Sequence, residues 1–189
     1  MDVSGLSLYN DGSRYLLTCI DVFSKRAWAV PVRRKTGQNV AEAFEKILAD
    51  RNCNMLQSDK GTEFLNSTFQ SILRRRGIKF YTSENEDLKA AVVERTNGTL
   101  KTKMFRYFTH ANMRRYLDVL DDLLQSYNNR HHRSIGMAPS EVRLVGGRTD
   151  YDMSRFYMTL PSNSSIDCYP DNSVARFTTK LNGGIELEL

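Results

Sequence analysis

Residues 9–32, YNDGSRYLLTCIDVFSKRAWAVPV, decide the fold, because a turn signal is followed there by two β-rich stretches. The first four residues, YNDG, are typical of hairpin turns. Residues 14–23 are nearly all apolar, as expected of a strand that is buried on both faces of a sheet. Residues 27–32 predict a further strand, in which Pro31 indicates an edge position or a strand end. Together with an extended stretch that starts at Met1, these segments predict an antiparallel meander of three strands.

Downstream of this meander the hydrophobic pattern changes to the period of helices. A helix that starts near Thr36 places four apolar residues on one face; they are Val40, Phe44, Ile47 and Leu48. The elements predicted after it are a strand at 54–58, a helix closed by Gly77, a strand at 78–82, a polar loop at 83–89 and helices at 89–108 and 113–127. An antiparallel meander followed by β-α-β units predicts an α/β fold with a mixed sheet flanked by helices.

The composition is that of a globular domain. The chain has 189 residues, of which 40% are hydrophobic and 26% charged, so it can bury a core without disulfide support. No run approaches the ~18 apolar residues of a membrane span, and residues 1–12 do not resemble a signal peptide. The three cysteines are far apart and form no CxxC pattern, which argues against a disulfide framework and favours a reducing compartment.

The charge is distributed unevenly along the chain. The formal net charge is +5, but residues 74–115 carry eleven basic and four acidic groups, a local balance of +7. Residues 150–189 have a balance of −3. The basic segment favours a polyanionic partner. The change of sign predicts a division into a core at 1–149 and a C-terminal extension at 150–189.

Three carboxylates from separate predicted elements are candidates for a metal site. Asp59 follows a strand, Glu94 lies early in a helix, and Asp2 belongs to the first extended stretch. Carboxylates that converge at one sheet edge suit Mg²⁺, and a pair of such ions can activate an in-line displacement at phosphorus. The alternative for each acid is ordinary: Asp59 as a turn residue, Glu94 as a partner of the helix dipole.

Glu94, Asn97 and Lys101 fall on one stripe of the predicted helix, because their positions are i, i+3 and i+7. A carboxylate, an amide and an ammonium group in a row would suit a metal ion that is flanked by a DNA strand. A solvated helix face explains the same spacing.

Four blocks of sequence resemble the integrase catalytic core that retroviral integrases share with related transposases. They are residues 15–28 (YLLTCIDVFSKRAW), 56–64 (LQSDKGTEF), 92–103 (VVERTNGTLKTK) and 126–142 (SYNNRHHRSIGMAPSEV). More narrowly, the chain is similar to integrases of the Polinton (Maverick) type of transposon. The resemblance covers roughly residues 1–145, and the four blocks occur in the order of the family.

The resemblance implies an RNase H-like fold and a metal-dependent polynucleotidyl transferase that performs DNA end processing and strand transfer. Its catalytic and metal-binding acids would be Asp2, Asp59 and Glu94, with Mg²⁺ or Mn²⁺ as cofactor. The 35 positions between the last two acids are close to the usual spacing of the family. Asp21, in the IDxFS motif, is implied to be structural. Four further residues are predicted to contact DNA: Asn97, Lys101, Lys60 and Arg95.

The chain departs from the family pattern at both ends. Asp2 is either the first metal ligand or the second acid of a pair whose first member lies upstream, in which case truncation would make the chain inactive. Residues 153–189 do not continue the integrase pattern and resemble the beginning of a different protein of the same transposons. They are expected to pack poorly on the core, so that proteolysis would leave a fragment ending near residue 150. An ordinary β-rich extension is the alternative.

The functional expectation is therefore DNA integration by a transposable element. Two alternatives stay open: an RNase H-like nuclease that cuts without joining, and a nucleic-acid-binding remnant without enzymatic activity. The expected partners are transposon ends and target DNA, with a homodimer or higher oligomer and no membrane. The DNA substrate implies a nuclear location.

Overall fold

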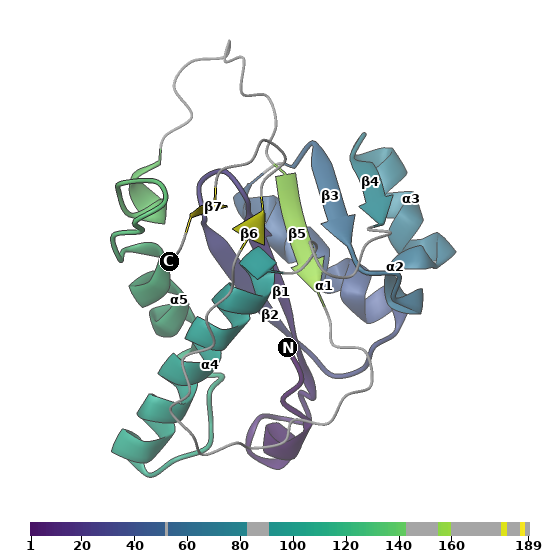
Figure 1. Ribbon diagram of the computed structural model, residues 1–189. Coiled ribbons are helices and arrows are strands. Elements are labelled where there is room, and N and C mark those ends of the chain that lie inside the picture. The colour runs from purple at the N-terminus through teal and green to yellow at the C-terminus, as the bar shows by residue number, and fades with distance from the viewer. Residues whose placement is uncertain (52, 83–90, 143–154, 160–178, 181–185, 188–189) are drawn as a thin grey trace.

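A five-stranded mixed sheet forms the centre of the fold in a computed structural model of the chain (Figure 1). The structure describes residues 1–51, 53–82, 91–142, 155–159, 179–180 and 186–187. The strand order is β2-β1-β5-β3-β4, with β1 at Tyr15–Asp21, β2 at Ala27–Val32, β3 at Met55–Ser58, β4 at Lys79–Thr82 and β5 at Arg155–Thr159. Strand β1 is antiparallel to both of its neighbours, β2 and β5, whereas β5, β3 and β4 run parallel to one another.

The mostly apolar residues 14–23 contain a strand that is buried on both faces, as predicted. Six of the seven residues of β1 are buried, because the strand lies inside the sheet and carries helices on both faces. Strand β2 lies at the edge and pairs only with β1. Its Pro31, opposite Leu16, therefore lies in the edge strand that the sequence indicated for it.

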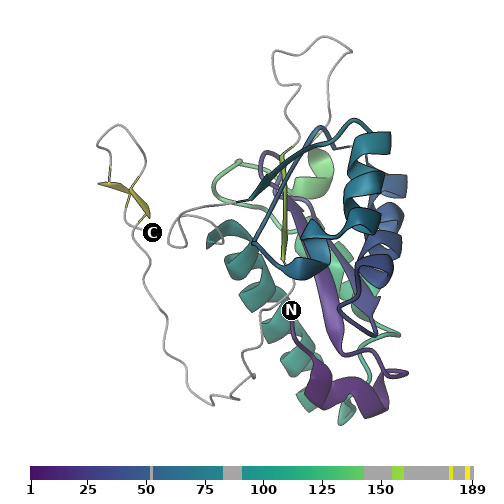
Figure 2. The ribbon, with the colours of Figure 1, turned by 90° about the vertical axis from the view of Figure 1, so that its right-hand side faces the viewer.

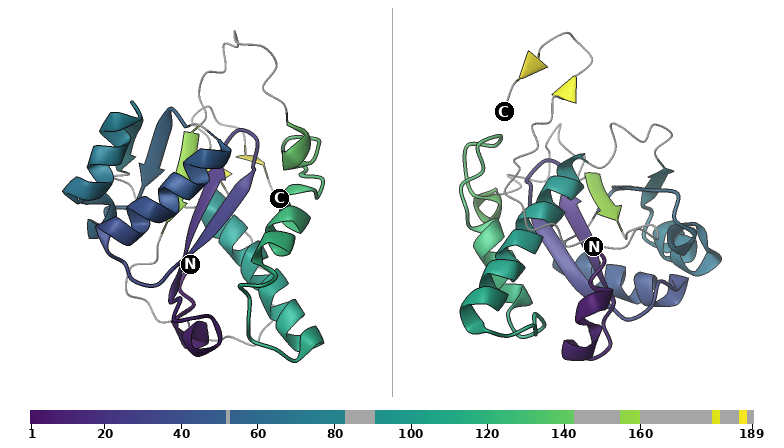
Figure 3. Two further views of the ribbon diagram at one scale, coloured as in Figure 1. Left: turned by 180° about the vertical axis from the view of Figure 1, so that it is seen from behind. Right: turned by 60° about the horizontal axis from the view of Figure 1, so that its bottom comes forward.

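Helices cover both faces of this sheet (Figures 2 and 3). Helices α1 (Gly37–Asp50), α2 (Thr62–Leu65) and α3 (Ser67–Arg75) pack on one face. Helices α4 (Ala91–Ala111) and α5 (Leu120–Asn128) pack on the other, with α4 crossing the sheet obliquely. Helix α1 begins where predicted, since the Thr36 side chain accepts a hydrogen bond from the Asn39 amide. Helix α3 is followed by Gly77 at φ +68°, as its C-terminal signal requires.

The predicted first strand and last helix are wrong in part. Residues 4–9 form a 3₁₀ helix, η1 (Ser4–Tyr9), and only Asp2 makes a β-bridge, to Tyr15. Helix α5 starts at Leu120 rather than near Met113, which is half-exposed. Buried Asn10 explains both differences: its Oδ1 accepts hydrogen bonds from the Tyr116 and Leu117 amides, which holds residues 114–117 against the N-terminal segment.

Strand β5 overturns the expectation that residues 153–189 pack poorly, at least for the five residues that form it. It pairs with β1 over Thr18–Asp21 and with β3 over Met55–Ser58, and its Met158 is buried in the core. Strand β5 therefore provides the hydrogen-bonding partner for one edge of β1 and for one edge of β3. The predicted loop at 83–89 lies outside the described residues, and the boundary between 149 and 150 stays a prediction.

Three shorter elements complete the described chain: η2 (Pro139–Glu141), β6 (Thr179–Lys180) and β7 (Glu186–Leu187). Among the described residues, no helix is long and apolar enough to cross a membrane.

Candidate active site

Asp59 directly follows the carboxyl end of β3, where an α/β sheet commonly carries functional groups. Its residue is exposed, and its Oδ1 accepts a hydrogen bond from the Gly61 amide at 3.3 Å. Partial burial of the carboxylate raises the pKa of Asp59, and the nearby Glu63 raises it further, against the lowering effects of the Gly61 amide and Lys35. The ionised form of Asp59 is therefore less favourable than that of a free aspartate, as is common for carboxylates at functional sites.

Asp2 lies at the same end of the sheet. It bridges to Tyr15 at the start of β1, and its Oδ1 accepts the Ser4 amide at 2.8 Å. The neighbouring Met1 amino group donates to the Leu16 carbonyl, and burial lowers its pKa to about 5. The charges of Asp2 and Asp59 both oppose that shift, so both carboxylates lie close enough to this amino group to act on it.

Glu94 is exposed in the first turn of α4. The following residue, Arg95, lowers the pKa values of Lys25 and His132, after the larger effect of their burial. Lys25 follows the opposite end of β1 from Tyr15. The first turn of α4 therefore extends toward the end of β1 that lies away from Asp2.

The three predicted acids do not assemble into a metal cluster. Among the described residues, no three His, Cys, Asp or Glu side chains lie close enough together to hold a metal ion. The sheet position between β1 and β3 explains this in part, because β5 fills it and its sequence, RFYMT, contains no acid. Asp2 meets β1 only beyond the end of β5, at Tyr15. Carboxylate oxygens are suitable ligands for Mg²⁺, but the described residues do not present three of them together.

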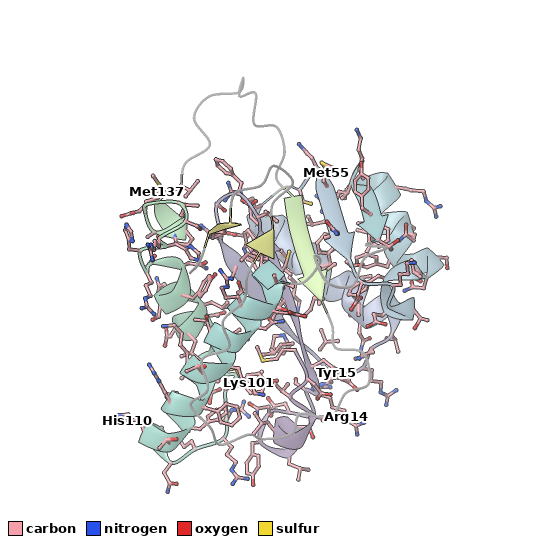
Figure 4. The ribbon with its side chains drawn as sticks, in the orientation of Figure 1. Arg14, Tyr15, Met55, Lys101, His110 and Met137 are labelled. Atoms are coloured by element: carbon pink, nitrogen blue, oxygen red, sulfur yellow. The ribbon has the colours of Figure 1, made fainter. Side chains whose placement is uncertain are left out.

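The four predicted DNA contacts are distributed over two sides of α4 and the end of β3. Lys60 is exposed beside Asp59, and Arg95 lies toward Lys25. Asn97 is half-buried, and its Oδ1 is buried without a hydrogen-bond partner among the described residues. Lys101 lies in the middle of α4 (Figure 4) and lines a cavity together with Asp2.

Asp21 is structural, as the IDxFS motif implied. It is almost completely buried, and its carboxylate accepts hydrogen bonds from the Phe23 amide and the Ser24 hydroxyl. Arg51 lies 3.9 Å from it. The carboxylate therefore stabilises the turn between β1 and β2.

Two residues that shape this end of the molecule, Asn10 and Lys35, were not predicted from the sequence to do so. Asn10 was interpreted only as part of a turn, although its side chain bridges segments 104 residues apart. The charge of Lys35, 24 positions before Asp59 in the sequence, lowers the pKa of the Asp59 carboxylate. Periodicity carries no signal for such contacts, because both residues lie outside regular elements.

Comparisons with known proteins agree with the predicted fold. Residues 1–87 match the family model of the integrase core domain. The chain is 21% identical to the catalytic core domain of HTLV-2 integrase in a structure with magnesium, at a TM-score of 0.60, over 69% of this chain and 85% of that one. This likeness shows the fold, which is the RNase H-like fold that the sequence predicted.

Relatives in sequence come from mobile elements. The chain is 38% identical over 135 residues to a transposon-derived protein of Caenorhabditis elegans, covering 70% of this chain and 47% of that protein. It is 29% identical over 142 residues to the InsK transposase of insertion sequence element IS150 of Escherichia coli, covering 71% of this chain and 50% of the transposase. The chain thus spans about half the length of these relatives.

Proposed function

We propose that the chain is a member of the integrase and transposase superfamily and that it acts in DNA integration as a metal-dependent polynucleotidyl transferase. The observation that carries the proposal is the position of Asp59 at the carboxyl end of β3, in an RNase H-like sheet within the matched residues. We further assign the chain to a transposable element of the Polinton (Maverick) type, which acts in the nucleus.

The proposed chemistry is the transfer of a DNA strand at phosphorus. A divalent ion, Mg²⁺ or Mn²⁺, would stabilise the charge that develops there. Asp59 and Glu94 are the proposed ligands, with Asp2 as the candidate for the third. Since the described residues do not bring three acids together, ion binding would have to accompany a rearrangement of this region.

DNA ends and target DNA are the proposed partners. The basic balance of residues 74–115 supplies the electrostatic attraction, which predicts affinity that falls steeply with salt. Asn97, Lys101, Lys60 and Arg95 are the proposed contacts. The HTLV-2 integrase core has been solved in a dimeric and a trimeric form, and we propose that this chain also self-associates.

A strand-transfer assay with Mg²⁺ or Mn²⁺ tests this proposal. The substrate is a labelled duplex that carries a transposon end, and the product is its covalent joining to a plasmid. Asp59→Asn should abolish joining, whereas Asp122→Asn, an exposed acid in the first turn of α5, should leave it unchanged. Joining that survives Asp59→Asn would contradict the assignment of Asp59.

A non-enzymatic nucleic-acid-binding protein is the second candidate. The observation that favours it is the acid-free β5 between β1 and β3, together with the lack of a three-acid cluster among the described residues. DNA binding without cleavage or joining in either metal would support this candidate. Cleavage without joining would instead indicate an RNase H-like nuclease.

A further inference from the structure

A cavity of about 660 Å³ lies between residues 1–6 and the second half of α4 with the loop that follows it. Buried Met104 and Phe108 contribute its apolar lining, and half-exposed Phe105 and Met113 also line it. Two cations, Lys101 and Arg114, belong to the same lining. The cavity therefore combines an apolar interior with positive charge.

Each of the two cations that line the cavity lies over an aromatic ring, and Phe105 is the one of these two rings that belongs to the lining. The Lys101 ammonium lies 5.9 Å from the centroid of the Phe105 ring, whose residue is 44% exposed. The Arg114 guanidinium, next to the cavity, lies 5.7 Å from the centroid of the Tyr9 ring, whose residue is 47% exposed. Each pair thus offers a flat apolar surface beside a positive charge.

The acids in this region are engaged in other contacts. The carboxylate of Asp11 forms hydrogen bonds with Arg115, which also contacts Asp118. Asp2 lines the cavity, but its Oδ1 accepts the Ser4 amide. Lys101 and Arg114 therefore face one carboxylate, that of Asp2, and the charged side chains of the lining have a net charge of +1.

We propose that this cavity binds an unpaired segment of DNA, with a base against the Phe105 ring and phosphates at Lys101 and Arg114. Single-stranded nucleic acid is bound by this combination, since every base has a face that stacks on an aromatic ring and every phosphate is attracted to a cation. The proposal rests on the proposed function and adds the form of DNA that the chain prefers.

The cavity is continuous with the proposed DNA contacts on α4. Lys101 belongs both to the stripe of Glu94 and Asn97 and to the cavity lining. Eleven residues of helix separate Glu94 from Phe105, a rise of about 16 Å at 1.5 Å per residue. At the ~3.4 Å rise per nucleotide of a DNA strand, a tail of about five nucleotides spans this distance.

Fluorescence anisotropy with two labelled DNAs tests the proposal on the full chain. One is a blunt duplex, and the other is the same duplex with a five-nucleotide single-stranded tail. The tailed DNA should bind about fivefold or more tightly, at the lower end of what stacking of one base provides. Phe105→Ala and Phe105→Leu should remove this preference, and Leu keeps the apolar bulk if Ala disturbs folding.

The matched control is Phe23→Ala, a phenylalanine that is 49% exposed in the turn after β1 and outside the cavity lining. It should keep the preference for the tailed DNA. Equal binding of tailed and blunt DNA by the wild type would overturn the proposal, and so would an equal loss of affinity for both DNAs in Phe105→Leu. Neither result would contradict DNA binding by the wild-type chain. Failure of the chain to bind either DNA would contradict the proposed function as well.

Discussion

Met158→Ala tests whether the C-terminal segment is part of the core. Met158 lies in β5, opposite Cys19 of β1 and Ser58 of β3, and its residue is only 2% exposed. Shortening a buried methionine to alanine removes its transfer free energy, about 1.5–3 kcal/mol for a whole side chain of this class. The cavity that remains adds to this loss, so the free energy of unfolding should fall by about 2–5 kcal/mol.

Urea unfolding measures this effect, with the fluorescence of Trp28, the only tryptophan, as the probe. The midpoint should fall while the slope stays constant, because the surface exposed on unfolding is nearly the same. Met137→Ala is the matched control: Met137 is 42% exposed, and the change should stay within about 0.5 kcal/mol.

Equal stability of Met158→Ala and the wild type would refute the reasoning. β5 would then not occupy the sheet in solution, and the expectation of a separable extension would be restored. A chain that ends at residue 150 gives a second measurement. It should unfold at lower urea than the full chain, because β1 and β3 both lose their partner along one edge.

Two further predictions concern the N-terminal segment and the pH dependence of stability. Asn10→Ala should lower the free energy of unfolding by about 1–3 kcal/mol, because the buried Tyr116 amide loses its acceptor, whereas exposed Asn129→Ala should change it little in the same urea assay. Asp59→Asn should raise the melting temperature slightly at pH 7, since a raised pKa means that the folded chain holds the proton more tightly and loses stability as the pH rises above 3.8. A melting temperature of this variant below that of the wild type at pH 7 would contradict the assigned cause.

The sequence predicted those parts of the fold that local pattern determines. The apolar run of β1 required burial on both faces, Pro31 required an edge strand, and the cap at Thr36 fixed the start of α1. Asp59 could also be placed from sequence, because a short strand followed by Asp-Lys-Gly locates it at a strand end. These features depend on periodicity and on backbone chemistry within a few residues.

Long-range contacts determined the rest, and no local pattern encodes them. The insertion of β5 between β1 and β3 depends on free hydrogen-bonding edges of strands more than 90 residues away, which a sequence pattern does not show. Asn10 looks like a turn residue, yet its four hydrogen bonds join η1 to the segment before α5. Long-range contacts also determined the arrangement of Asp2, Asp59 and Glu94. Sequence supplied three acids with suitable chemistry, and the tertiary structure placed an acid-free strand at the centre of the sheet beside them.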